Sequence, residues 1–194
     1  MKRRLLATAL ACVVVLAGSP AQAGEQVVTA TDPAGDQQMT SDPGGLSVAQ
    51  RRSIDIRRLA VIKGTSSTRF VIRLKRLYPR AARFDQMVFV TLKSPASADP
   101  GYLTEIGMTA QARTKDLSYA YLTPDTTGDN LVVCDPLTAK VRKKRKVVFL
   151  DVPHTCIPAG PVKIRVTSAT GTFRSEGGGY SRDRMKVAGT YVLE

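Results

Sequence analysis

Three aspartates near the start of the chain have the residue types that a calcium site needs. Asp32 and Asp36 lie on one turn, Asp-Pro-Ala-Gly-Asp, and Asp55 opens a later strand. Calcium takes about six to eight oxygen ligands and tolerates loop geometry. Asp55 would lie beside the turn if its strand pairs with residues Gln26–Thr31.

The alternative is an Asx turn, in which Asp32 and Asp36 bond their own backbone around Gly35. Asp55 would then meet a nearby arginine, and the sequence offers Arg51, Arg52 and Arg57. Because the spacing of the aspartates is not that of a regular calcium loop, we favour the Asx turn over calcium binding.

A run of five consecutive cations is the second motif, and it consists of Arg142, Lys143, Lys144, Arg145 and Lys146. Such a run attracts polyanions. It can equally be a solvated hairpin turn or an edge strand whose charges prevent sheets from associating. The very apolar segment Val147–Val152 follows directly, so a flanking charge block also acts as a gatekeeper against aggregation. We favour this structural interpretation over a binding role.

The cysteines predict a disulfide rather than a reactive thiol. Cys134 and Cys156 are 22 positions apart, and two cysteines alone do not complete a four-ligand zinc site. The spacing also excludes a Cys-x-x-Cys redox pair. A Cys156 nucleophile beside His154 is the alternative, but an even cysteine pair in an exported protein favours a bridge.

An enzymatic site is not evident in the sequence. The single histidine, His154, lies near Asp151, and no Gly-x-Ser-x-Gly motif accompanies it. No zinc cluster, phosphate-binding loop or catalytic carboxylate pair is recognisable. We therefore lean against an enzyme, and we keep as the alternative a secreted hydrolase whose site is not visible in sequence.

The elements that must position these residues are β-strands, because apolar residues recur with a period of two. In Phe70–Lys75 the apolar residues share one face and the cations occupy the other, as in half-buried antiparallel strands. No segment has the apolar stripe of a helix. The sequence predicts an all-β, antiparallel, jelly-roll-like β-sandwich of about nine strands, over residues 26–31, 54–62, 70–75, 87–92, 102–110, 117–122, 147–152, 162–167 and 190–193.

The first 23 residues have the three parts of a cleavable signal peptide. A positive start precedes the apolar segment Leu5–Leu16, and Ala21-Gln22-Ala23 supplies a small-x-small cleavage site. The apolar segment is too short to cross a bilayer, and Cys12 lies too early for a lipoprotein. We expect cleavage after Ala23, secretion, and a single β-sandwich domain over residues 24–194.

Charge and composition constrain the partners. Removing the three cations of the signal segment from a net charge of +13 leaves +10, which attracts anionic polymers without specifying the fold. Aromatic residues form only 6% of the chain and Trp is absent. This shortage counts against carbohydrate and single-strand nucleic-acid sites, which use stacking aromatics.

The motif Asp32–Asp36, a polar loop and then Ser53–Ile56 resembles the start of small exported actinobacterial-type β-sandwich proteins. The Cys134 region and the run Val147–Pro153 before Cys156 also suit this group. Such proteins are similar in outline to carbohydrate-binding and DOMON-like sandwiches. The resemblance implies a jelly-roll-like sandwich and no particular activity, because such folds host many functions.

Taken together, these features predict an exported, non-enzymatic binding or interaction module that associates with anionic envelope polymers. We expect no sequence-specific nucleic acid, no transmembrane segment and no cofactor other than the calcium considered above. A surface-structural protein held by charge on the envelope is a further interpretation.

Overall fold

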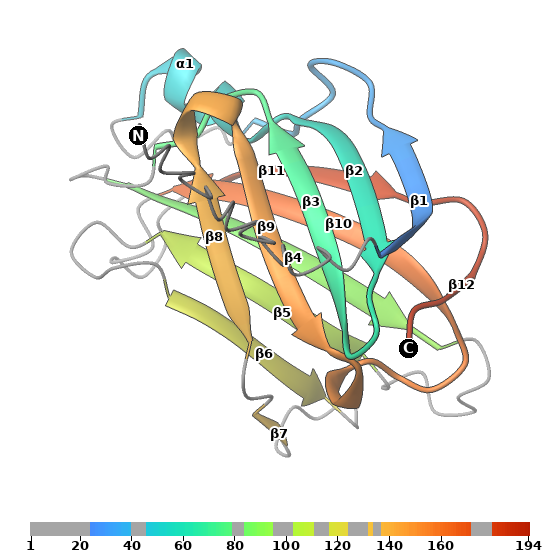
Figure 1. Cartoon of the computed structure of the whole chain (residues 1–194). Helices are drawn as coiled ribbons and strands as arrows, with labels where there is room; N and C mark the ends of the chain where they lie inside the picture. The colour runs from blue at the N-terminus through green and yellow to red at the C-terminus, as the bar shows by residue number, and fades with distance from the viewer. Residues whose placement is uncertain are drawn as a thin grey trace, which may run out of the picture.

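The chain folds into two antiparallel β-sheets (Figure 1). The computed structural model describes residues 24–39, 46–78, 84–94, 103–110, 117–123, 132–133, 137–171 and 180–194. The predicted signal peptide and Cys134 lie outside these described residues. Because the described residues form mostly antiparallel strands in these two sheets, the all-β class predicted from the sequence is confirmed.

One sheet has five strands in the order β1-β2-β3-β9-β8, and it lies in front in Figure 1. Its strands alternate between a buried and an exposed face. In β3, Phe70, Ile72 and Leu74 are buried, while Arg69 and Arg73 are exposed. The bounds are β1 (Glu25–Thr31), β2 (Ile56–Lys63), β3 (Ser67–Leu74), β8 (Thr138–Arg142) and β9 (Val147–Pro153).

The other sheet has seven strands, with the order β11-β10-β4-β5-β6-β7 and β12 paired with β10. Its longest strand, β10, alternates buried Val162, Ile164 and Val166 with exposed Lys163 and Arg165. The bounds are β4 (Asp85–Lys93), β5 (Leu103–Ala110), β6 (Leu117–Thr123), β7 (Val132–Val133), β10 (Pro161–Gly171), β11 (Tyr180–Lys186) and β12 (Tyr191–Val192).

Short helical turns connect the strands, although the sequence predicted no helix. The helix α1 (Val48–Arg51) is held by a capping box, in which the Gln50 N–H donates to Ser47 Oγ and the Ser47 N–H donates to Gln50 Oε1. Three 3-10 turns complete the described elements: η1 (Arg52–Ile54), η2 (Lys143–Arg145) and η3 (His154–Cys156). Within the described part of the chain, no helix has the length and apolarity to cross a membrane.

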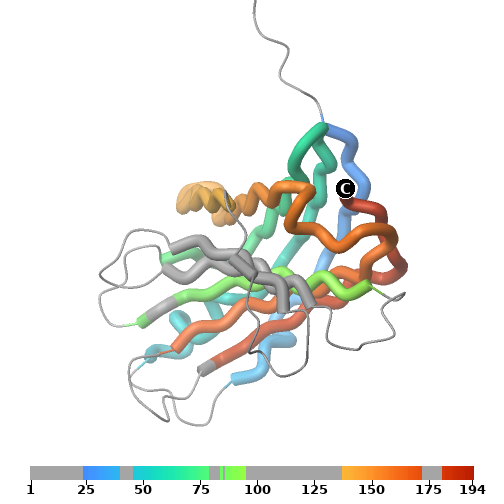
Figure 2. The backbone as a smooth tube through the Cα atoms, turned by 90° about the horizontal axis from the view of Figure 1, so that it is seen from below, coloured from blue at the N-terminus to red at the C-terminus, as the bar shows by residue number. Residues whose placement is uncertain are grey.

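Side chains from both sheets form one buried hydrophobic cluster. Ile72 and Leu150 of the five-stranded sheet and Val90 and Val166 of the seven-stranded sheet are each 0% exposed. The two sheets can be followed as separate groups of strands in Figure 2. The hydrophobic effect on this shared cluster therefore holds the two sheets together.

Each of the nine predicted strand segments coincides with a strand of the structure. Three strands were not predicted, namely β7, β8 and β11. β7 has only two residues, and the other two contain alternating charges in place of a long apolar pattern.

Candidate functional site

The acidic turn that follows β1 is attached to the edge strand β11. The Gln38 N–H donates to the Arg182 carbonyl at 2.8 Å, and the Arg182 N–H donates back to the Gln38 carbonyl at 3.0 Å. This attachment places Asp183 beside the turn. One carboxylate oxygen each from Asp32, Asp36 and Asp183 lie within 4.8 Å of one another. Below, the term acidic cluster means these three residues together with Asp55.

Asp55 lies directly beneath the turn and is completely buried. Its Oδ2 accepts the Gly35 N–H at 3.1 Å and the Arg57 Nη2 at 2.7 Å. The expected arginine partner is thus Arg57. The Gly35 N–H, at the centre of the predicted Asx turn, donates to Asp55. An Asx turn at Asp32 is defined by the N–H two residues on, that of Ala34, so it stays a prediction.

Asp183 is the member of the cluster that sequence reasoning missed. It is 3% exposed, its Oδ2 accepts the Ile56 N–H at 2.6 Å and its Oδ1 accepts the Arg184 N–H at 2.8 Å. No local sequence pattern marks it, because β11, in which it lies between the buried Ser181 and Met185, lacks an apolar alternation. An aspartate on the buried face of a strand needs a specific partner.

The electrostatics of the acidic cluster favour protons or cations. Burial, followed by the charges of Asp183, Asp36 and Asp55, raises the pKa of Asp32 to about 7. Burial also raises the pKa of Asp183, against the lowering effect of the hydrogen bond from Ile56. Like charges that share a site disfavour ionisation, and burial does the same. The cluster therefore has a deficit of positive charge.

The basic run of the sequence forms the turn between β8 and β9. All five of its residues are exposed, and Lys146 adopts a left-handed conformation with φ of 58°. The Leu74 N–H donates to the Lys146 carbonyl at 3.0 Å, which holds the turn against the end of β3. Below, the term basic turn means Arg142, Lys143, Lys144, Arg145 and Lys146.

Further cations gather beside the basic turn. A hollow of about 540 Å³ is lined by Arg52 of η1, Lys75, Arg76 and Lys146, together with Val48, Ala49 and Ser53. The structure thus brings cations from three separate segments to one end of the molecule.

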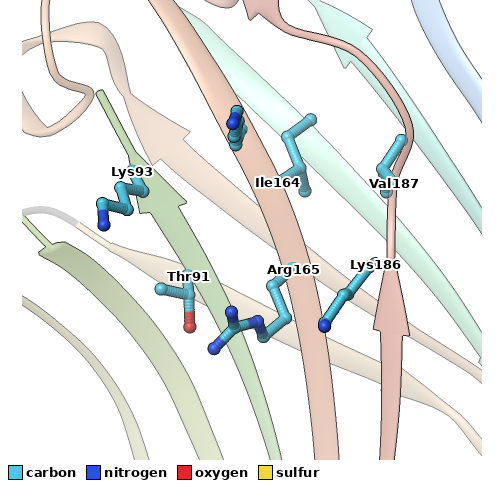
Figure 3. Close-up of a pocket in the computed structure, with 7 residues that line it drawn as sticks. Thr91, Lys93, Ile164, Arg165, Lys186 and Val187 are labelled. Carbon is cyan, nitrogen blue, oxygen red and sulfur yellow. The ribbon is translucent and has the colours of Figure 1, made fainter. Parts of the chain in front are cut away.

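A second basic surface lies on the outer face of the seven-stranded sheet, and the sequence did not predict it. Lys93 of β4, Lys163 and Arg165 of β10 and Lys186 of β11 are exposed. They line a hollow of about 180 Å³ with Thr91, Ile164 and Val187 (Figure 3). Below, the term basic face means these four cations.

The cations of the basic face lie directly opposite one another across neighbouring strands. Lys163 pairs in register with Lys93, and Arg165 pairs with Lys186. Like charges in such positions destabilise a sheet. None of the described residues that line the hollow is acidic.

Asp151 and His154, the two residues considered for an enzymatic site, each bond to other residues and not to one another. Asp151 receives both Nε and Nη2 of Arg69, at 2.5 and 3.0 Å. His154 Nε2 lies 3.4 Å from Thr68 Oγ1, and the His154 N–H donates to the Ser66 carbonyl. Asp151 is therefore engaged with an arginine and does not orient the His154 ring.

Cys156 lies in η3 and is 4% exposed, whereas its predicted partner Cys134 lies outside the described residues. Burial of Cys156 fits a structural role, since reactive thiols are partly exposed.

No family model, curated protein or solved structure matches the chain.

Proposed function

We propose that this protein is an exported, non-enzymatic module that binds anionic envelope polymers through the basic face. The observation that carries the proposal is the register of β10, which sets Lys163 against Lys93 and Arg165 against Lys186. Like charges directly opposite one another on neighbouring strands destabilise the sheet. An anionic ligand lying across the strands would remove that repulsion.

The shape of the basic face suits a repeating, flexible polyanion. The Arg165 side chain extends toward Thr91 and the Lys186 side chain extends toward Arg165, so donors from three strands border one shallow hollow (Figure 3). The guanidinium of Arg165 can bind a phosphate or sulfate through two parallel hydrogen bonds. The lysines then supply charge to neighbouring groups of the polymer without reading any sequence.

The remaining parts of the proposal concern processing and fold. We infer that residues 1–23 are a signal peptide cleaved after Ala23, and that residues 24–194 form one jelly-roll-like β-sandwich. The shared core of the two sheets supports this fold, and it suits the exported actinobacterial-type sandwiches that the sequence resembles.

A Cys134–Cys156 disulfide completes the proposed fold. Cys134 follows β7 directly, and β7 pairs with β6. Cys156 lies in η3, which contacts β6. The topology thus supports a bridge between the two cysteine-bearing segments.

The test is elution from immobilised dextran sulfate in a salt gradient. Counterion release makes polyanion affinity fall steeply with salt. The double variant Lys163→Gln/Arg165→Gln removes two charges from the basic face and should elute at clearly lower salt than wild type.

The matched control removes two charges from dispersed sites, with Lys63→Gln on β2, where Lys63 lies opposite Glu25, and Lys140→Gln on β8. β3 and β9 separate these strands, so the two charges lie about 14 Å apart, beyond the Debye length of about 8 Å. The control should elute close to wild type. An equal shift for both variants would show that only net charge matters and would refute the proposal.

A third variant, Lys143→Gln/Lys144→Gln, measures the basic turn. We expect a smaller shift than for the basic face, because the turn has an independent structural role beside β9. A larger shift would place the binding surface on the turn instead.

A further inference from the structure

The acidic cluster contains oxygen atoms that are buried without any partner. Asp55 is completely buried, and its Oδ1 makes no hydrogen bond. The Oδ2 of Asp32 is also buried and unpartnered. A buried carboxylate oxygen without a donor is costly, and native structures rarely leave one unless a ligand or water completes it.

The position of the unpartnered Asp55 oxygen connects it with the cluster. The other oxygen of the same carboxylate binds the Gly35 N–H at 3.1 Å, and Gly35 lies within the turn that carries Asp32 and Asp36. The unpartnered oxygen is therefore at the base of that turn. Gln37, which is 8% exposed, also has an unpartnered Oε1.

We propose that the acidic cluster is a Ca²⁺ site, with carboxylate ligands from Asp32, Asp36 and Asp183, and that the buried carboxylate of Asp55 adds negative charge beneath the turn. Calcium–oxygen distances are about 2.3–2.6 Å, so ligands on opposite sides of one ion are about 4.6–5.2 Å apart. The three carboxylate oxygens lie within 4.8 Å of one another, which matches a single calcium ion.

The donor chemistry selects among metals. All candidate ligands are oxygens, and among the described residues neither a histidine nor a cysteine belongs to the cluster. Hard oxygen ligands suit Ca²⁺ and Mg²⁺, whereas zinc and copper favour nitrogen and sulfur. Magnesium requires near-ideal octahedral geometry at about 2.0–2.1 Å and retains several waters. A cluster of several carboxylates on a loop and on the strand β11 is better suited to calcium.

The hydrogen bonds that Asp183 already makes leave it free to bind a metal. Each of its oxygens accepts one N–H, from Ile56 or from Arg184, and a carboxylate oxygen has a second lone pair. These bonds orient the carboxylate in the way that outer hydrogen bonds orient metal ligands. The ion would then join the loop after β1 to β11, and so link the two sheets.

The test is thermal unfolding of EDTA-treated protein during titration with CaCl₂, accompanied by calorimetric titration of the same sample. A ligand that binds only the folded state raises its melting temperature with concentration. We expect a rise of roughly 5–10 °C when calcium is about 100-fold above its dissociation constant, with about one ion bound per chain. The proposal is overturned if calcium neither raises the melting temperature of the wild-type protein nor binds to it in the calorimetric titration.

Two variants locate the ion. Asp36 is exposed, so Asp36→Asn should preserve the fold while removing most of the calcium response. The control Glu25→Gln, at an exposed position of β1, should respond like wild type. A full calcium response in Asp36→Asn, or an equal response of wild type to MgCl₂, would overturn the assignment.

Discussion

Replacing Gln86 by methionine should destabilise the protein through the loss of buried hydrogen bonds. Gln86 of β4 is 1% exposed. Its Oε1 accepts the Tyr78 N–H at 2.7 Å, and its Nε2 donates to Ser53 Oγ at 2.6 Å and to the Arg76 carbonyl at 3.3 Å. One side chain thus joins the seven-stranded sheet to η1 and to the segment that follows β3.

The magnitude follows from the groups that the substitution leaves unpaired. A buried polar group without its partner costs about 1–3 kcal/mol. We apply this cost to the two shorter hydrogen bonds of Gln86, those with the Tyr78 N–H and with Ser53 Oγ. Methionine has a similar length and volume, so the cavity contribution is small. We therefore expect the free energy of unfolding to fall by about 2–4 kcal/mol.

Urea denaturation followed by circular dichroism measures this change. The midpoint should fall while the dependence on urea stays constant, because the surface exposed on unfolding is unchanged. The control Gln26→Met changes an exposed glutamine of β1 and should stay within about 0.5 kcal/mol of wild type. A loss below about 1 kcal/mol for Gln86→Met would refute the role assigned to these bonds.

Three further predictions concern separate regions. Unreduced, denatured protein should yield no alkylatable thiol at Cys134 or Cys156 in intact-mass measurements, and the closed loop should contribute about 3 kcal/mol; two alkylated thiols would exclude the bridge. Lys146→Gly should raise the free energy of unfolding by up to about 1 kcal/mol, because φ of 58° disfavours residues with a Cβ; a loss in urea denaturation would contradict this. In calcium-free protein the raised pKa of Asp32 means that the folded state holds a proton that the unfolded chain releases. The free energy of unfolding should therefore fall as pH rises from about 4 to about 7, by on the order of 1 kcal/mol after solvent screening. Urea denaturation at several pH values measures this fall, and the Asp32→Asn variant should lack the part of it that Asp32 contributes.

Strands with a clear apolar alternation could be predicted from the sequence. The segment Phe70–Leu74 shows why, because its buried and exposed residues alternate in the structure as they do in the sequence. β11 could not be found in this way, since its residues Ser181, Asp183 and Met185 present a mixed buried face. Short α1 escaped prediction because a capping box rather than an apolar stripe holds it.

The site residues divide according to whether neighbours in space are neighbours in sequence. The basic turn is a contiguous run and was visible directly. The basic face combines Lys93 with Lys163 and Lys186, and their proximity depends on a strand register that no local pattern specifies. The same holds for Asp183, which meets Ile56 across 127 positions of sequence.

The alternation in β11 also protects the fold against mispairing. Asp183 is buried, while Arg184 and Lys186 on the opposite face are exposed. A slip of one residue against β10 exchanges the two faces of a strand, so it would bury the cations and expose Asp183. Because β11 is the edge of its sheet, its cations also oppose pairing with a strand from another molecule. The charge pattern of one short strand thus allows a single register and discourages aggregation at the edge it occupies.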